Sequence, residues 1–300
     1  MPTSYLPIST TYAGQAAAGY IKSAFLANES LQYLTVKENI EYKQVVRKFV
    51  DDITFEAPTC DFTPLGTSVL SERVLTLEKF QVQRQYCKKD FLTDWETKSV
   101  QNGQLHASLI DAIIANVMAG IAARNEVLIW QGVNATAGQY DGFETLFSAG
   151  GSGVNAVATP VAITEANVLD KIKLLVAACP LKVRKATEKP LIYISSDVAE
   201  AYRNKLASQG NGFFYSAGAP IKMTWNGMFD IVECAGMSTN TMVMAQKSNL
   251  WFGTNLMSDW NEVALLDMYQ YDLSDNIRFN AKFFAGCQFG FGDEIAYYNA

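Results

Sequence analysis

The sequence has very few of the side chains on which most enzyme sites depend. Its 300 residues include a single histidine, His106, which excludes two-histidine metal sites and the H-E-x-x-H motif. His106 lies in the helix-like stretch QLHASLIDAII, where Ser108, two positions away, does not face it. We therefore expect a structural role for His106. The five cysteines are scattered and form no C-x-x-C pair, which argues against a zinc ribbon or a disulfide-stapled domain.

Phosphate-binding loops and paired acids are also missing. The glycine-rich run SAGGSGVNA (148–156) lacks the lysine of a phosphate loop and is expected to be a flexible linker. The run FAGCQFGFGDE (284–294) alternates like a strand, so its glycines are expected to allow close packing. The adjacent acids at 51–52 and 293–294 would point to opposite faces of a strand. We therefore expect no catalytic residue, cofactor or metal, and no enzyme activity.

Basic charge and long apolar runs are scarce as well. The formal net charge is −6, which argues against a protein that grips nucleic acid through a basic groove. No run approaches the ~18 consecutive apolar residues of a membrane span. The opening MPTSYLPISTTYAGQ lacks a basic region followed by an apolar one, so no signal peptide is expected. The chain is expected to be made and used in a reducing cytoplasm.

Two segments, 43–57 and 73–87, show the alternation of apolar and polar residues that is typical of half-buried strands. The segment between them, PTCDFTPLGTSVLSE, is rich in proline, glycine, serine and threonine, which favour turns. We therefore predict a long β-hairpin. Arms of about 15 residues at about 3.3 Å per residue would reach roughly 50 Å. A compact chain of this length is also roughly 50 Å across, so the hairpin must cross the body or project from it.

A projecting hairpin exposes side chains that its own two strands cannot bury. An isolated two-stranded hairpin is marginally stable in water, so it needs another chain to lie on. We therefore predict that its apolar residues make an inter-subunit contact. These residues are Phe55, Phe62, Leu65, Val69 and Leu70.

The remaining pattern is a mixture of helices and strands. Apolar residues recur at helical spacing from 104 to 131, which predicts a helix of about 28 residues and ~42 Å. A second helix is expected over 163–179, and a strand followed by a serine-capped helix over 189–210. A strand-rich tail follows. The predicted fold class is α+β, with segregated helices and antiparallel strands.

The order of these parts resembles the major capsid proteins of tailed bacteriophages, whose fold encapsulins share. Four segments carry the resemblance: RVLTLEKFQVQRQYCKKDFLTDW (73–95), QLHASLIDAIIANVMAGIAARNEVLIWQG (104–132), LIYISSDVAEAY (191–202) and NIRFNAKFFAGCQFGFGDEIAYY (276–298). The resemblance implies an N-terminal arm over 1–42, an extended hairpin loop over 43–88, a peripheral domain over 89–185 with a spine helix over 104–131, an axial domain over 186–262, and C-terminal strands over 263–300 that return to the peripheral domain.

By this resemblance the protein would self-assemble into pentamers and hexamers of an icosahedral phage head that encloses double-stranded DNA. It would be part of the virion and would assemble in the bacterial host cytoplasm. The implied partners are further copies of itself, a portal protein and cement or decoration proteins, with packaged DNA touched only weakly and without specificity. The hairpin begins near residue 43, which leaves no room for an N-terminal scaffolding segment. Scaffolding is therefore expected to be a separate protein or absent.

Some members of this family weld neighbouring subunits through a lysine of the hairpin loop. Residues 59–72 contain no lysine, and Cys60 is the reactive side chain at the predicted tip. A disulfide through Cys60 is disfavoured in a reducing cytoplasm. We therefore expect the subunits to be held together without covalent bonds.

Two alternatives remain open at this point. An encapsulin, which encloses an enzyme cargo, resembles the spine and axial parts, but such proteins generally open directly with a helix. The polar opening MPTSYLPISTTYAG favours the phage interpretation. An enzyme of an unrecognised type is the other alternative, and the sequence offers it no catalytic motif.

Overall fold

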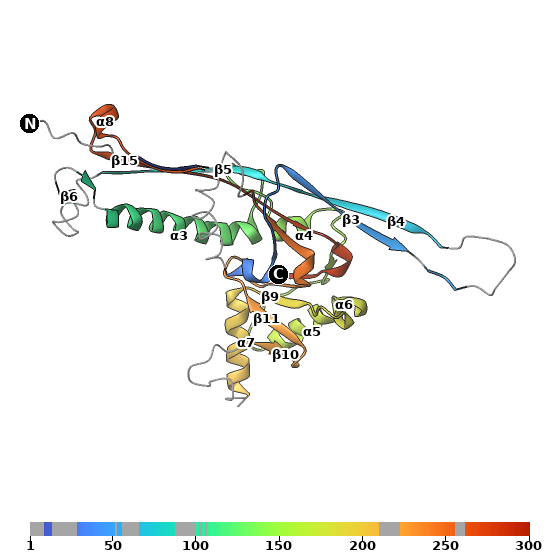
Figure 1. Cartoon of the computed structure of the whole chain (residues 1–300). Helices are drawn as coiled ribbons and strands as arrows, with labels where there is room; N and C mark the ends of the chain where they lie inside the picture. Colours follow the sequence, from blue (N-terminus) through green and yellow to red (C-terminus); the bar gives the residue numbers. More distant parts are fainter. Residues whose placement is uncertain are drawn as a thin grey trace, which may run out of the picture.

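A flat sheet with one long helix beneath it, a projecting hairpin and a smaller helix-covered sheet make up the molecule (Figure 1). The computed structural model describes residues 9–13, 29–51, 53–55, 66–87, 100–101, 104–105, 107–209, 223–255 and 262–300. The helices are η1 (Ser30–Tyr33), α3 (Ala107–Gln131), α4 (Phe143–Ser148), α5 (Val168–Ala178), α6 (Leu181–Lys185), α7 (Ser196–Ser208), η3 (Lys247–Asn249), α8 (Tyr269–Asp272) and η4 (Gly292–Glu294).

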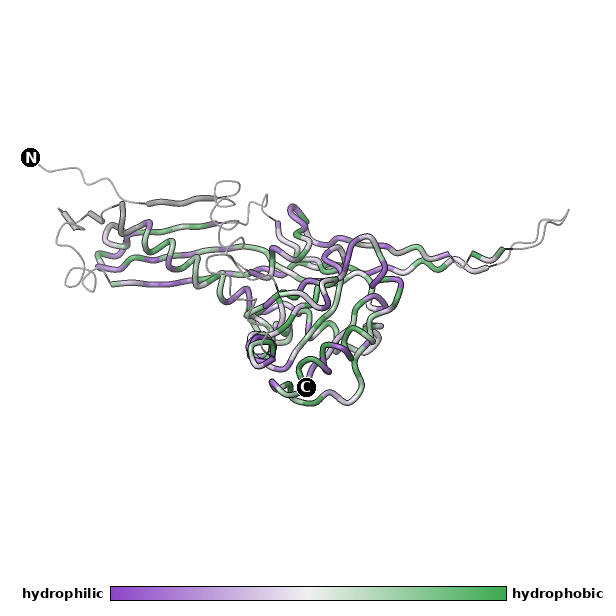
Figure 2. The backbone as a smooth tube through the Cα atoms, turned by 90° about the horizontal axis from the view of Figure 1, so that it is seen from below, coloured by the Kyte–Doolittle hydropathy of each residue, from purple (hydrophilic) through white to green (hydrophobic). Residues whose placement is uncertain are grey.

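The larger sheet is built around β15, the longest strand of the described residues. Its order is β1-β14-β15-β13-β2, and β5 pairs with β15 beside this path. The strands are β1 (Ser9–Ala13), β2 (Thr35–Lys37), β5 (Glu78–Cys87), β13 (Leu250–Gly253), β14 (Glu262–Asp267) and β15 (Asn276–Phe289). Figure 2 shows extended segments of the chain side by side at one end of the molecule and the hairpin projecting from the other end.

Helix α3 covers one face of this sheet. Its apolar residues Ile113, Val117, Ile121 and Leu128 are buried in one cluster with residues of β5 and β15. The predicted helix over 104–131 is confirmed from Ala107 onward, whereas Gln104–Leu105 form strand β7, paired with β6 (Val100–Gln101). By length and composition, Asp111–Gln131 could also cross a membrane, but 56% of its most apolar 18-residue window is buried inside the protein. A buried core helix meets the same criterion.

The hairpin is formed by β3 (Lys43–Asp51) and β4 (Ser68–Thr76), which pair antiparallel from Lys43 with Thr76 to Asp51 with Ser68. The prediction was wrong about the second arm. Residues 78–87 leave the hairpin as β5 and pair with β15 along ten positions. Both pairings satisfy the same alternating pattern, so the pattern could not distinguish them. The paired part of the hairpin is therefore nine residues, about 30 Å long.

The second half of the glycine-rich run at 148–156 packs against the C-terminal residues, whereas Gly150 and Gly151 are exposed, as expected of a linker. Asn155–Ala156 form β8, which pairs with β16 (Ala296–Asn299). A Cβ on Gly292 would lie 2.0 Å from the carbonyl oxygen of Ser152, so the two chains touch through their backbones. The prediction that glycines of 284–294 allow close packing is confirmed here and at Gly286, where a Cβ would lie 2.3 Å from the Thr76 oxygen.

The smaller sheet lies below the larger one in Figure 1 and has the order β10-β11-β9-β12-β16-β8. Its other strands are β9 (Leu191–Ile194), β10 (Thr224–Trp225), β11 (Phe229–Glu233) and β12 (Thr241–Ala245). Helices α5 and α7 pack on it through a second core cluster that includes Ile172, Val198 and Met242. Strand β9 followed by α7 confirms the strand and helix predicted within 189–210, with Ser195 at the N-cap position but without a side-chain cap bond. Helix α5 begins at Val168, later than predicted.

The predicted division into arm, hairpin loop, peripheral and axial domains stays a prediction. Two strands pair with strands on the other side of a predicted domain boundary. Strand β13 lies within the range predicted as axial but pairs with β15, and β16 lies in the C-terminal range but pairs with β12. His106 lies outside the described residues, as do the last residue of the predicted 189–210 segment and most of the predicted N-terminal arm.

Candidate assembly surface

One face of the hairpin carries exposed apolar pairs. Val45 lies opposite Val74, and Phe49 lies opposite Leu70. Their exposed fractions are 47% for Val45, 37% for Val74, 64% for Phe49 and 61% for Leu70. We call these four residues the hairpin face. Because side chains alternate across a strand, cross-strand partners share one side of the ribbon.

Polar pairs separate the apolar ones on the same side. Arg47 Nε lies 3.4 Å from Glu72 Oε2, and the Ser68 hydroxyl donates to the Asp51 carboxylate. Both pairs are exposed, so they contribute little to stability. Their value is to fix the register of the two strands while the apolar pairs stay exposed.

Three of the five predicted contact residues lie in the described part of the chain, and all three are exposed. Phe55 is 96% exposed and Val69 is 59% exposed, and Leu70 belongs to the hairpin face. Val69 pairs with Val50 and therefore lies on the opposite side from Leu70. Phe62 and Leu65 lie outside the described residues. That these five residues contact another subunit stays a prediction.

Val45, Phe49 and Val74 were not among the contact residues predicted from the sequence. The spacing of Val45 and Phe49, four residues apart in a strand, already placed them on one side. Their partners could be named only once the register was known, because a shift of one residue moves every side chain to the other side.

The root of the hairpin is firmly attached to the body. Leu75 and Leu77 are buried in a cluster with three residues of the loop before β3 and of the larger sheet, Ile40, Trp251 and Phe284. The Arg73 guanidinium lies 4.0 Å from the centre of the Phe289 ring, and its Nη2 donates to the Ser152 carbonyl at 2.6 Å. Partial burial lowers the pKa of Arg73. The hairpin is thus anchored at one end and exposed along its length.

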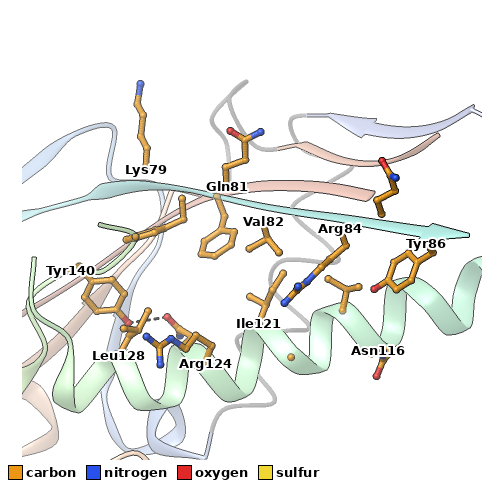
Figure 3. Close-up of a pocket in the computed structure, with 17 residues that line it drawn as sticks. Lys79, Gln81, Val82, Arg84, Tyr86, Asn116, Ile121, Arg124, Leu128 and Tyr140 are labelled. Atoms are coloured by element: carbon orange, nitrogen blue, oxygen red, sulfur yellow. Dashed lines mark hydrogen bonds between the residues drawn. The ribbon is translucent and has the colours of Figure 1, made fainter. Parts of the chain in front are cut away.

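A cavity of about 670 Å³ lies between β5 and α3. Figure 3 shows Arg84 reaching from β5 toward α3, and Arg124 lying along α3 beside Leu128. At its inner end the Tyr140 hydroxyl donates to Asn125 Oδ1 at 2.8 Å. The Nδ2 atom of the buried Asn125 has no hydrogen-bond partner among the described residues. Burial raises the pKa of Tyr140 well above its ordinary value, so the phenol stays a donor. We call this cavity the β5–α3 groove.

Two buried glutamates join segments that are far apart in the sequence. Glu126 of α3 accepts hydrogen bonds from the backbone nitrogen and the hydroxyl of Ser30, and Trp130 Nε1 donates to the same hydroxyl at 2.9 Å. Glu144 of α4 accepts from the nitrogen and hydroxyl of Ser238 at 2.8 and 2.6 Å. Burial raises the pKa of both carboxyls. Because serine donors already occupy their oxygens, these acids serve as ties between segments.

Metal and thiol chemistry have little support in the described part of the chain. There, no group of three or more histidine, cysteine or acidic side chains is placed to hold a metal ion. Burial raises the pKa of Cys179 to about 11 and those of Cys234 and Cys287 further, so these thiols are poor nucleophiles at neutral pH.

Comparison with known proteins relates the fold to one class. No protein-family model matches the sequence, and no curated protein matches it. Among solved structures, the chain is similar to the capsid of a native GTA particle, with 14% identity, a TM-score of 0.62, and coverage of 91% of this chain and 90% of that one.

Two further structures extend this result. The satellite phage P4 procapsid, described as including a size determination (Sid) protein, has 10% identity and a TM-score of 0.57, covering 94% of this chain and 98% of that one. The cyanophage A-1(L) capsid has 12% identity and a TM-score of 0.58, covering 90% and 91%. The chain therefore has the fold of phage capsid proteins, and the predicted α+β class is confirmed.

Proposed function

We propose that this protein is the major capsid protein of a tailed bacteriophage and that its function is to assemble with copies of itself into a closed shell. The observation that carries the proposal is the hairpin, which is anchored at its root and exposes apolar residues along both strands. The capsid fold, matched over about nine-tenths of the chain, supports it.

The hairpin needs a neighbour for physical reasons. A two-stranded ribbon does not bury its own side chains, and an exposed apolar ribbon is prone to unwanted association unless a partner covers it. Figure 1 shows the ribbon extending away from the body, so the body of its own chain does not cover it. A neighbouring copy of this chain is the simplest cover, because every subunit then both offers a hairpin and receives one.

The finer features of a phage head are also proposals. They include pentamers and hexamers in an icosahedral lattice, enclosed double-stranded DNA, a portal protein, separate scaffolding and decoration proteins, a place in the virion and assembly in the host cytoplasm. The net charge of −6 supports weak contact with packaged DNA. The matched structures named above are phage and GTA particles and lend no support to an encapsulin shell.

A hairpin deletion tests the proposal. Replacing residues 49–70 with Asn-Gly joins Lys48 to Ser71, which lie opposite each other, through a dipeptide that favours a tight hairpin turn. The deletion keeps Arg73 and the buried Leu75, so the root remains intact. We expect the wild type to form shells or capsomers visible in negative stain, and the shortened chain to fold without forming closed shells.

Point variants test whether assembly depends on the apolar side chains of the hairpin or only on the hairpin being present. The double variant Phe49→Ser/Leu70→Ser removes one apolar pair, and we expect it to lower shell yield strongly. Arg47→Gln/Glu72→Gln changes the neighbouring polar pair on the same side, and shells are expected to persist because exposed ion pairs contribute little. Wild-type protein that stays monomeric at all concentrations, or deletion variants that form normal shells, would refute the proposal.

A further inference from the structure

We propose that the β5–α3 groove is a binding site for a small aromatic anion, a molecule that joins a flat apolar ring to a carboxylate or a phosphate. The inference goes beyond the proposed function and does not depend on assembly, because the groups that would hold the ligand all belong to one chain.

The face of β5 that lines the groove is apolar except at one position. Side chains alternate along a strand, so Phe80, Val82, Arg84 and Tyr86 lie on one face of β5, and all four line the groove. Figure 3 shows Arg84 extending from β5 toward α3. The strand pattern would place another apolar side chain at this position. A guanidinium group beside apolar and aromatic side chains is well placed to bind an anion.

A second arginine reaches the groove from the helix. Arg124 lies one turn of α3 beyond Ile121, and both line the cavity. Neither Arg84 nor Arg124 forms an ion pair within the part of the chain that the structure describes. No acidic side chain is among the described residues that line the groove. Two guanidinium groups without a counter-charge favour an anionic ligand, and their planar donors match a carboxylate or a phosphate.

Aromatic rings form part of the wall. The ring centre of Phe80 lies 5.7 Å from that of Tyr140 and 5.7 Å from that of Phe283. Val117 and Ile121 of α3 also line the cavity. Aromatic rings at such separations attract one another beyond the effect of buried apolar area. The ring of a ligand would therefore extend an existing aromatic cluster.

Glycine leaves room for this ring. Gly120 of α3 and Gly138 line the groove, and a Cβ added at either position would meet no atom of the described residues within 4 Å. Glycine weakens the interior of a helix relative to alanine, so the space beside Gly120 has a cost for the fold. The cavity volume of about 670 Å³ is within the usual range of small-molecule sites.

A buried amide in the lining lacks one partner. Asn125 is 3% exposed, and its Oδ1 accepts from the Tyr140 hydroxyl at 2.8 Å. Its Nδ2 has no hydrogen-bond partner among the described residues. Turning the amide over would let Nδ2 donate to Tyr140 and leave Oδ1 unpaired instead. In either orientation one polar atom is unsatisfied, which is costly in a buried place. A polar substituent on the ring of the ligand would pair with it.

Duplex DNA is a less suitable occupant. Proteins that bind DNA through phosphates usually spread many lysines and arginines over the contact. Here two arginines line one cavity in a chain whose net charge is −6. The stacked bases of a duplex would also not reach the rings of the groove.

The fluorescence of anilinonaphthalene sulfonate tests the proposal, because this probe is an aromatic anion. We expect the full chain to bind the probe and Arg84→Gln/Arg124→Gln to raise its Kd about tenfold or more, because both charged donors are lost. Phenylnaphthylamine has the same rings without the sulfonate, so the double variant should leave its Kd unchanged. Lys79→Gln removes a cation that points away from α3 (Figure 3), and wild-type binding of the sulfonate is expected.

A second pair of variants tests the space for the ring. Gly120→Trp fills the groove and should abolish binding of both probes, whereas Gly120→Ala leaves room and should retain it. The chain with the shortened hairpin described above should bind the sulfonate as the wild type does, because the groove is separate from the hairpin face. Circular dichroism melting curves check that each variant folds. If Gly120→Trp does not fold, the arginine variants still decide the test.

Competition identifies the anionic group. AMP carries a phosphate and naphthoate a carboxylate, each on a molecule with a flat ring. Displacement of the sulfonate by either one supports the proposal and assigns the class of ligand, and displacement by neither overturns it. Equal binding of the sulfonate by the wild type and the arginine double variant would also overturn it, as would binding that is lost only when the hairpin is shortened. A wild type that binds the probe but forms no shells would overturn the proposed function and leave this inference standing.

Discussion

Single buried residues decide how the N-terminal segment is attached to the long helix. Glu126 accepts two hydrogen bonds from Ser30, which lies 96 positions earlier in the sequence, and Trp130 donates a third to the Ser30 hydroxyl. A buried carboxyl is costly when charged, which is why its pKa rises. The carboxylate is nevertheless well placed, because both donors of Ser30 end on it.

The raised pKa of Glu126 gives a pH prediction. The folded protein binds the proton of Glu126 more tightly than the unfolded chain does, because the pKa of this carboxyl has its ordinary value of 4.5 only in the unfolded chain. Its contribution to stability is therefore complete below that value and is lost as the pH rises through the raised pKa. We expect Glu126→Gln to gain in melting temperature relative to the wild type between about pH 4.5 and pH 7. Parallel melting curves for the two proteins across this range would contradict the prediction.

Glu126→Ala is the matched variant. It leaves the nitrogen and hydroxyl of Ser30 without an acceptor, and we expect a loss of about 1–3 kcal/mol of unfolding free energy at every pH. Glu144 has the same direction of pKa shift, so it adds to the slope of the wild-type curve. Comparison of Glu126→Gln with the wild type isolates the share of Glu126.

At the scale of elements, the sequence predicted what depends on local pattern and missed what depends on distant partners. Helix α3 was predicted nearly in full, because large apolar residues such as Ile113, Val117 and Ile121 recur four positions apart, and these are the residues that the helix buries. Strand β5 was assigned to the hairpin because residues 68–87 contain no strong turn signal, and the partner β15 lies some 190 positions away in the chain. The glycine-rich run was taken for a linker because composition does not reveal that Gly292 packs on Ser152.

The same reasoning applies to the candidate surface. Leu70 and Val69 are adjacent apolar residues in the sequence, and only the pairing of β3 with β4 shows that they lie on opposite sides. The β5–α3 groove was not predicted at all. It combines Arg84 with Arg124 across two elements whose contact no local pattern encodes.

The attachment of the hairpin gives a prediction at this scale. Arg73 stacks on Phe289 and donates to the Ser152 carbonyl, so it links β4 to two other segments. We expect Arg73→Met to remove about 1–2 kcal/mol of local stabilisation. Amide hydrogen exchange should become faster in β3 and β4 while β15 and α3 stay protected. Hydrogen exchange with mass spectrometry measures this directly.

Arg73→Lys is the control for the hairpin root. It keeps a positive charge near the ring but loses the planar group that stacks and donates at the same time. We expect exchange rates in β3 and β4 between those of the wild type and Arg73→Met. Faster exchange spread equally over β15 and α3 would show that Arg73 supports the whole fold rather than the hairpin root.

At the scale of the whole molecule, the shape separates a body of two sheets from a ribbon that reaches outward (Figures 1 and 2). The body has two sheets with their own buried clusters, whereas the ribbon keeps its apolar side chains exposed. This division suits the function proposed above, in which a folded subunit recognises its neighbours.

The last prediction concerns how assembled subunits stay together. A covalent weld through the distal hairpin would need a reactive side chain there, and residues 59–72 contain no lysine. Cys179, Cys234 and Cys287 are buried free thiols, and Cys87 is a half-buried free thiol at the end of β5, so Cys60 is the one cysteine of residues 59–72. Burial of the ribbon against neighbours would make such a bond unnecessary. Assembled particles boiled in denaturant without reductant should therefore run as one band near 33.1 kDa. A ladder that reductant and Cys60→Ser abolish would reveal a disulfide, and a ladder that survives both would reveal another weld; either result would contradict non-covalent assembly.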